Sequence, residues 1–279
     1  MSVSKLVPEV WTASILRNFE KSTVFGNLLN RDYTGDLSYG NKVFIPRILP
    51  VAARPYSDKI PIQYDDIQSS MTELEIDQQS YFAIKAFDIE EVQAKPKFLD
   101  SATKNGGYAL RDTIDKFCAG VIENGAGIKI GSKTTPISLH SKNILEQISL
   151  ISQRFNENNI PENGRWLVLP PWTYRTLQHA NIALSSVTPE NKIITEGFIS
   201  RSLGFDIYVS NNVPTVQDEY SAILAGTEEC GSLVMQIEKL EELRDKDFFA
   251  SLIRALSVYG SSITQPSAAA VLYVEEAAS

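Results

Sequence analysis

The sequence is short of the residue types on which most small catalytic and metal sites depend. Among its 279 residues there are only two cysteines, Cys118 and Cys230, and two histidines, His140 and His179. Two cysteines are too few for a disulfide framework, and we expect both to be reduced thiols. With no Cys-x-x-Cys and no His-Glu-x-x-His motif, a zinc site is not expected either. The sequence therefore predicts neither a bound metal nor another cofactor.

Long apolar runs and an excess of basic charge are also missing. No apolar run approaches the roughly 18–20 residues that span a bilayer, and the start "MSVSKLVPEVW" lacks the features of a signal peptide. We therefore expect no membrane association and synthesis in a cytosol, which the resemblance described below implies is the cytoplasm of a bacterial host. The formal net charge is −8, and lysines and arginines are interleaved with acids. Because tight DNA binding requires many neutralised phosphates, specific DNA binding is not expected.

What the chain does have is a regular alternation of helix and strand patterns. Apolar residues four apart, including Trp11 and Phe19, predict an amphipathic helix over about 8–20. Period-two alternation predicts a strand over 72–87. A strand of that length is unusual, so we expect a bulge or bend near Gln78-Gln79.

A long helix is predicted over 96–123, with Pro96 at its start and Gly125 after its end. Gly106-Gly107 in its middle indicate a bend or a close helix contact. The expected apolar stripe consists of Phe98, Ala102, Ala109, Thr113, Phe117 and Val121, with Leu110, Ile114 and Ile122 beside it.

The second half of the chain predicts a mixed α/β region. Ser141 is expected to cap a helix, and the apolar face of that helix consists of Ile144, Ile148, Ile151 and Phe155. "NGRWLVLPP" predicts a short buried strand, "WTYRTLQHA" a helix and "YSAILAGTEECGSLVMQIEKL" strand, turn and strand. The final "FFASLIRALSVYGSSITQPSAAAVLYV" predicts a pair of strands. The fold class is therefore α+β.

One stretch, Gly125–Thr135, resembles a phosphate-binding loop, "GAGIKIGSKTT". Its register does not fit, because Gly131 is followed by Ser132 rather than by lysine. A phosphate-binding loop also opens a helix, whereas these glycines follow one. A surface turn is the better interpretation, and a nucleotide-binding enzyme is kept only as an alternative.

The stretch from 34 to 66, "TGDLSYGNKVFIPRILPVAARPYSDKIPIQYDD", does not look like core. It is strand-like at Lys42–Ile45 and is then interrupted by prolines. A long unprotected hairpin presents edges that recruit other chains. We therefore interpret it as an arm that lies across a neighbouring subunit, with proline reducing its freedom.

The order of these parts resembles the major capsid (coat) protein of tailed bacteriophages, the Hong Kong 97 type of fold. "VPEVWTASILRNFEKSTVFGNLLNRDYTGDL" is similar to the start of short phage coat proteins. "YFAIKAFDIEEVQAKPKFLDSATKNGGYALRDTIDKFCAG" is similar to the strand that leaves the extended loop and enters the spine helix. "GFISRSLGFDIYVSNNVP" and "LSVYGSSITQPSAAAVLYV" resemble the late loop-strand and the terminal strand pair.

The resemblance implies five parts. They are an N-terminal arm, 1–32; an extended hairpin loop, 33–70; a peripheral domain, 71–134 with 247–266, which holds the spine helix 96–123; an axial domain, 135–246; and a C-terminal segment, 267–279.

The resemblance also implies a structural protein of the virion and no enzyme. Copies of the chain would assemble as hexamers and pentamers of an icosahedral phage head around double-stranded DNA. Because the chain begins directly at its arm, we expect a separate scaffolding protein or none; a portal and a decoration protein are further expected partners. Intersubunit contacts are expected at Arg47, Arg54, Asp58 and Lys59 on the loop and at Trp11 and Phe19 on the arm. The alternative is an encapsulin-like nanocompartment shell, which shares the fold and encloses enzyme cargo.

Overall fold

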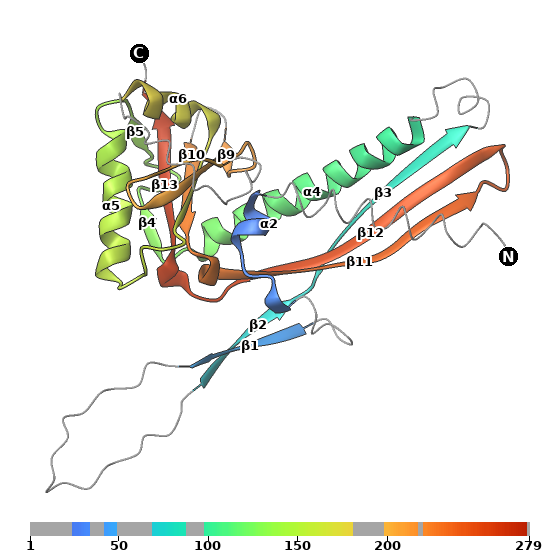
Figure 1. Cartoon of the computed structure of the whole chain (residues 1–279), viewed down its shortest axis with the longest axis horizontal. Coiled ribbons are helices and arrows are strands. Elements are labelled where there is room, and N and C mark those ends of the chain that lie inside the picture. The colour runs from blue at the N-terminus through green and yellow to red at the C-terminus, as the bar shows by residue number, and fades with distance from the viewer. Residues whose placement is uncertain are drawn as a thin grey trace, which may run out of the picture.

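A compact sheet, an elongated sheet and a projecting ribbon make up the part of the chain that the computed structural model describes: residues 24–33, 42–48, 69–87, 98–180, 198–216 and 220–277. Figure 1 shows the compact sheet with its helices at one end and the elongated sheet reaching away from it with the long helix α4. The ribbon leaves from the junction of the two. This combination of helices and separate sheets confirms the α+β class.

The compact body is built on an eight-stranded sheet in the order β4-β13-β10-β6-β8-β7, with β5 beside β13 and β9 beside β10. Every residue of β6 and β10 is buried, which explains their uninterrupted apolar sequences. The strands of the compact body are β4 (Ile128–Ile130), β5 (Ile137–Leu139), β6 (Trp166–Leu169), β7 (Phe198–Ser202), β8 (Phe205–Val209), β9 (Thr215–Val216), β10 (Tyr220–Gly226) and β13 (Ala269–Glu276).

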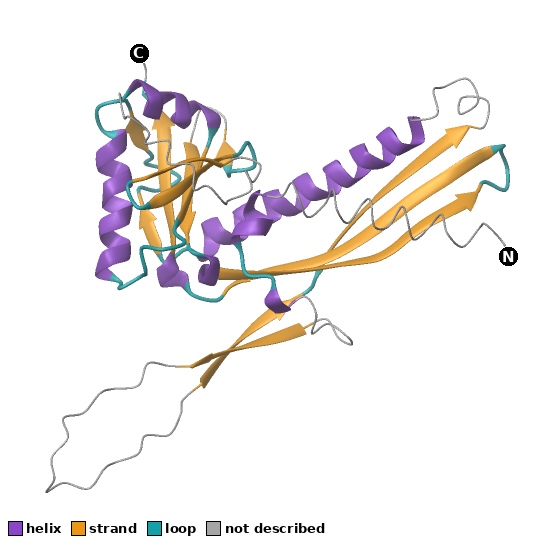
Figure 2. Ribbon diagram, in the orientation of Figure 1, coloured by secondary structure: helices purple, strands orange, loops and turns teal. Residues whose placement is uncertain are grey.

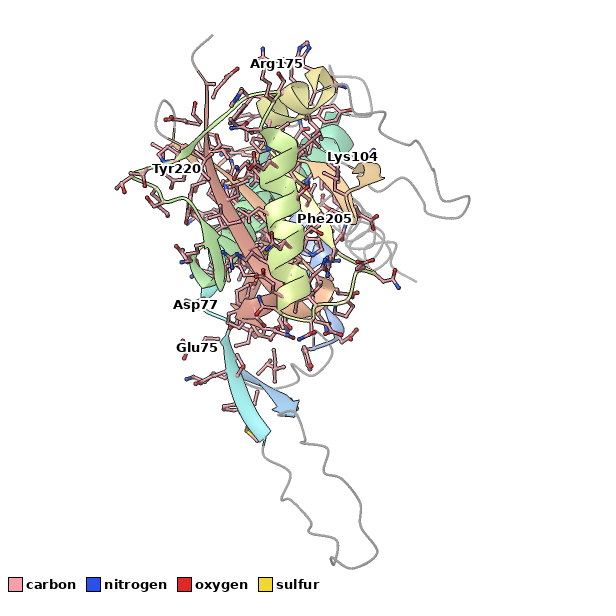
Figure 3. The ribbon with its side chains drawn as sticks, turned by 90° about the vertical axis from the view of Figure 1, so that its left-hand side faces the viewer. Glu75, Asp77, Lys104, Arg175, Phe205 and Tyr220 are labelled. Atoms are coloured by element: carbon pink, nitrogen blue, oxygen red, sulfur yellow. The ribbon has the colours of Figure 1, made fainter. Side chains whose placement is uncertain are left out.

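Two helices cover this sheet, α5 (Ile144–Glu157) and α6 (Pro171–His179). The predicted apolar face of α5 is confirmed, since its four members are fully buried. One of them, Phe155, lies 5.8 Å from Phe205 of β8, ring centroid to ring centroid, and Figure 3 shows Phe205 behind α5. The expected cap is wrong. The residue before the helix is Asn143 rather than Ser141, and Asn143 accepts a hydrogen bond from the His140 N–H at 2.9 Å.

The elongated body is a three-stranded antiparallel sheet in the order β11-β12-β3, with α4 along one face (Figure 2). Its strands are β3 (Gln78–Phe87), β11 (Gly231–Arg244) and β12 (Ala250–Ile263), and α4 spans Phe98–Gly125. Ile84 and Phe82 of β3 lie opposite Ile253 and Ala255 of β12 on the face toward the helix. Only this one face is covered, which is why β3 alternates so regularly.

The long helix is continuous through its two glycines, and the structure shows why one of them is there. A Cβ on Gly106 would lie 2.7 Å from the ring of Phe82, whereas a Cβ on Gly107 would meet nothing within 4 Å. The close contact that the sequence predicted is therefore confirmed at Gly106. The expected stripe is shifted: Ala109 and Thr113 are exposed, and the buried face consists of Thr103, Gly107, Leu110, Ile114, Cys118 and Ile122.

The predicted strand over 72–87 is two strands that belong to different sheets. The chain breaks at Ile76-Asp77, close to the expected bend, and separates β2 (Ser69–Glu75) from β3. β2 pairs with β1 (Lys42–Ile48) in an antiparallel ribbon, in which Ile48 lies opposite Ser69. Pro46 does not end β1 as expected. Both strands of a two-stranded ribbon are edges, where a missing N–H is tolerated.

The sheets also join segments that the expected division into parts keeps separate. β11, placed in the axial domain 135–246, pairs with β12 and so belongs to the elongated sheet. β4, placed in the peripheral domain 71–134, pairs with β13 in the compact sheet. The expected pair of C-terminal strands is wrong as well, because β12 and β13 lie in different sheets, joined across the short helical turn Pro266–Ala268.

Candidate functional site: assembly surfaces

The two faces of the ribbon differ in what covers them. Val43, Ile45 and Leu74 point toward the body and form a small buried cluster with Val234 of β11. On the opposite face Phe44 is 59% exposed and Met71 69% exposed. The ribbon therefore presents large apolar side chains that no described residue of its own copy covers.

A charged group braces the base of the ribbon across its two strands. Lys42 of β1 lies opposite Glu75 of β2, and its Nζ forms ion pairs with both Glu73 and Glu75. The hydrogen bonds that Lys42 donates to these two carboxylates hold its pKa well above its usual range. All three side chains face solvent, so the group fixes the strand register more than it stabilises the fold.

The ribbon joins the body at a tight crossing. A Cβ on Gly260 of β12 would lie 2.1 Å from the carbonyl oxygen of Glu75. β12 can pass this close to the end of β2 only because it has glycine there. Figure 3 shows Glu75 and Asp77 at this junction, with the ribbon pointing away from the body.

The segment that leads out of the N-terminal region is anchored to α4. The short helix α2 (Val24–Leu28) receives its cap from a distant residue, Asp115 of α4, which is only 2% exposed. Its carboxylate accepts hydrogen bonds from the N–H groups of Val24, at 3.0 Å, and Gly26, at 3.4 Å. Burial raises the pKa of Asp115. Just beyond α2, Asn30 forms a parallel bridge with Ser232 at the start of β11.

The face of the elongated sheet opposite α4 has a shallow hollow. Tyr81 and Ala83 of β3, Glu241 of β11, and Arg254 and Leu256 of β12 line it. Tyr81 is 76% exposed, and Arg254 Nε donates to Glu241 at 2.8 Å across the strands. No element in the described part of the chain lies over this hollow, which is an apolar surface bordered by an ion pair.

The stretch Gly125–Thr135 is not a phosphate-binding loop. It ends α4 and continues into β4, and the next helix in the chain begins only at Ile144. Lys133, the residue that would meet a phosphate, instead forms an ion pair with the buried Glu123 at 2.8 Å. The turn itself is closed by backbone hydrogen bonds between Ser132 and Thr135.

The two thiols are equally inert. Cys118 and Cys230 are both free and fully buried. Burial raises the pKa of Cys230 to about 12 and raises that of Cys118 as well. Within the described residues, no group of histidine, cysteine and acidic side chains could hold a metal ion, and no helix there is long and apolar enough to cross a membrane.

Most of the predicted contact residues cannot be placed. Arg47 lies in β1, opposite Ser70. Five others, Trp11, Phe19, Arg54, Asp58 and Lys59, lie outside the described residues. The structure adds Phe44, Met71 and Tyr81, which the sequence did not single out.

Comparison with known proteins identifies the class of this chain. A family model described as phage capsid protein matches residues 82–272, more than half of the chain. The chain therefore belongs to this family, whose role is structural. No curated protein matches it in sequence.

Solved structures agree in fold. A chain from Mycobacterium phage Che8 is 27% identical, with a TM-score of 0.71, and the match covers 90% of this chain and 91% of that one. The capsid of Ralstonia phage GP4 is 10% identical, with a TM-score of 0.72, and the match covers 94% of this chain and 91% of that one. A virus-like particle from Pyrococcus furiosus is 16% identical, with a TM-score of 0.60, and the match covers 96% of this chain and 99% of that one. The chain has the Hong Kong 97 type of fold and is similar to major capsid proteins of tailed phages.

Proposed function

We propose that this chain is the shell subunit of an icosahedral phage head, that its copies assemble as hexamers and pentamers around double-stranded DNA, and that the ribbon is the arm between copies. The observation that carries the proposal is the ribbon itself. It projects from the body with Phe44 and Met71 exposed, and among the described residues its own copy covers the other face.

The physical argument begins with the cost of an isolated ribbon. A lone two-stranded hairpin is marginal in water, and among the ribbon side chains that the structure describes, three are buried in a small cluster with Val234. A neighbouring copy that covered the exposed face would add the burial that the ribbon lacks. The ribbon should therefore contribute little to folding and much to assembly.

The hollow on the elongated sheet is the surface that suits this arm. It is lined by Tyr81 and Leu256 and bordered by Arg254, whereas the exposed side of the ribbon carries Phe44 and Met71 with Glu73 nearby. Apolar side chains would meet apolar lining, and opposite charges would set the register. Such contacts are modest singly, and repetition over many copies makes them effective.

The strength of contact between the shell and its packaged DNA follows from the charge of the chain. A chain of net charge −8 with interleaved basic residues cannot neutralise many phosphates at once, so contact with packaged DNA would be weak and unspecific. Scaffolding, portal and decoration partners stay predictions from the resemblance. So do contacts at Trp11, Phe19, Arg47, Arg54, Asp58 and Lys59.

Shortening the ribbon tests the proposal. Because Ile48 and Ser69 are the last paired residues that the structure describes, replacing 49–68 with Asn-Gly should close the ribbon with a two-residue turn. The variant should keep the circular dichroism and unfolding midpoint of the parent, yet form no closed shells. The double variant Phe44→Ser/Met71→Ser keeps the full ribbon, and it should likewise fold as the parent does and form no closed shells.

Two outcomes would contradict the proposal. If the shortened variant unfolds, the stretch belongs to the core of its own copy. If both the shortened variant and Phe44→Ser/Met71→Ser assemble normally, the ribbon is not the arm between copies.

A nanocompartment shell is the second candidate, and the likeness to the virus-like particle from Pyrococcus furiosus is the observation that favours it. At 16% identity that likeness shows the fold alone. Nuclease digestion of purified shells separates the two: protected double-stranded DNA supports the phage head, and enclosed protein without nucleic acid supports the nanocompartment.

A further inference from the structure

The sequence contains three Asn-Gly pairs, and the structure places them in different environments. They are Asn105-Gly106, Asn124-Gly125 and Asn163-Gly164. An asparagine before a glycine can lose its side-chain amide, because the backbone nitrogen of the glycine can attack the side-chain carbonyl carbon. The attack requires a glycine N–H that is not engaged in a hydrogen bond and a backbone that can rotate, which glycine permits because it has no Cβ.

Two of the pairs are protected by the long helix α4. Gly106 and Gly125 both lie within it, where backbone N–H groups donate to carbonyls one turn earlier. Both glycines are also tightly packed. A Cβ on Gly106 would lie 2.7 Å from the ring of Phe82, and a Cβ on Gly125 would lie 2.5 Å from Cγ1 of Ile263. Neither pair can react until the helix opens locally.

The third pair lies in an exposed turn between α5 and β6. Glu162, Asn163 and Gly164 are all exposed. The φ of Gly164 is +77°, which explains why the turn requires glycine. A Cβ on Gly164 would meet nothing within 4 Å, and no hydrogen bond within the described residues engages its N–H. This pair therefore meets the conditions for attack in the folded chain.

A buried arginine fixes the chain on the near side of this pair. Arg165 is 2% exposed, and its Nε donates to the carbonyl of Pro161 at 2.9 Å. Its Nη2 donates to Asn156 Oδ1 at 2.8 Å and to the carbonyl of Ile160. These bonds hold the end of α5 and the start of the turn, but none of them reaches the Asn-Gly pair. The compact body therefore stays folded while the pair itself changes conformation.

We propose that Asn163 is a site of spontaneous deamidation in the folded chain. The backbone nitrogen of Gly164 forms a bond with Cγ of Asn163, and the side-chain nitrogen leaves as ammonia with the proton of the glycine N–H. The product is a cyclic imide. Water then opens the imide at one of its two carbonyls and gives aspartate or isoaspartate. Either product adds one carboxylate to a chain whose net charge is −8.

The consequence is greatest in a protein that is not replaced after synthesis. Subunits of a finished shell are not renewed, so the products would accumulate as the shell ages. This consequence rests on the proposed shell function, whereas the reaction itself does not. Older shells would then differ from new ones in the charge on the surface of the compact body.

Mass spectrometry of the incubated chain tests the site. The full-length folded chain is kept at mildly alkaline pH in water labelled with heavy oxygen and is then digested with trypsin. Asn163 should gain one labelled oxygen at least about tenfold faster than Asn105 or Asn124, because the helix must open before either of these can react. In the chain unfolded in urea, the three pairs should react at similar rates.

Two variants connect the reaction to the charge of the chain. Asn163→Gln keeps an amide but lengthens the side chain by one methylene, which disfavours the attack. Asn163→Asp carries the charge of the product from the start. On an anion-exchange column the incubated parent should shift to the position of Asn163→Asp, whereas incubated Asn163→Gln should stay at the position of the fresh parent.

The outcomes separate this inference from the proposed function. Equal rates at the three pairs in the folded chain, or an Asn163 that reacts only after unfolding, would overturn it. Both measurements use the unassembled subunit. Failure of the chain to form shells would therefore count against the shell function and leave the assignment of Asn163 standing.

Discussion

Two adjacent glycines of α4 should respond in opposite directions to the same substitution. Alanine in a helix interior is favoured over glycine by about 0.8–1 kcal/mol. At Gly107 the added Cβ meets nothing within 4 Å, so Gly107→Ala should stabilise the subunit by up to about 1 kcal/mol. At Gly106 the Cβ would lie 2.7–2.9 Å from three ring atoms of Phe82, and overpacking of this kind costs about 1–3 kcal/mol.

The propensity gain at Gly106 is therefore cancelled or reversed, and the Gly107 variant should be the more stable by about 1–3 kcal/mol. Urea unfolding of the unassembled subunit, followed by circular dichroism, measures the difference. In a Phe82→Ala background the two alanine variants should agree to within about 0.5 kcal/mol, because the ring is gone. A Gly106→Ala subunit as stable as Gly107→Ala in the parent would refute the contact as the reason for this glycine.

Three further predictions concern buried and charged groups. Asp115→Ala should cost about 1–3 kcal/mol in urea unfolding, because it leaves two N–H groups of α2 without their acceptor. Asp112→Ala, which removes the exposed ion pair with Lys116 and a side-chain hydrogen bond with Asn212, should cost less, because the groups that it leaves are reached by water. Neither Cys118 nor Cys230 should react with maleimide at neutral pH until the chain unfolds, and rapid labelling of the native subunit would contradict their burial. The hydrogen bond from Lys85 lowers the pKa of Asp245 below its usual value of 3.8. The ion pair should therefore be complete above pH 3.8 and be lost as the pH falls through the lowered pKa, a titration that carboxyl NMR can follow. An Asp245 that titrates at or above pH 3.8 would contradict this ion pair.

Local patterns in the sequence were enough to predict several elements of this fold. The spacing of the apolar residues in α5 depends only on which of its side chains face the sheet, and the four residues that this spacing selects are the buried ones. The apolar run in "RWLVLPP" and the break near Gln78-Gln79 are equally local. Each of these features depends on residues that lie within about a dozen positions of one another, so short-range geometry determines it.

The pairing of strands could not be predicted in the same way. β12 and β13 are close in sequence and both apolar, yet a three-residue helical turn sends them into different sheets. β11 follows β10 directly and also changes sheet. The alternation within a strand shows that it has a covered face, but not which distant segment provides the cover.

The same limit applies to the assembly surfaces. The sequence identified the hairpin as an arm but treated its apolar residues alike. Val43 and Ile45 are buried against the body while Phe44 between them is exposed, and that choice depends on the position of Val234 nearly 200 residues later. Charged residues of the loop were chosen as contacts because charge is visible in a sequence, whereas an uncovered phenylalanine is visible only in the structure.

Electron cryo-microscopy of the purified chain, at rising concentration, tests the central claim most directly. We expect closed icosahedral shells in which the ribbon of each copy lies on the elongated sheet of a neighbour. Dispersed single subunits under every condition of salt and concentration, or shells in which each ribbon folds back onto its own copy, would contradict the account.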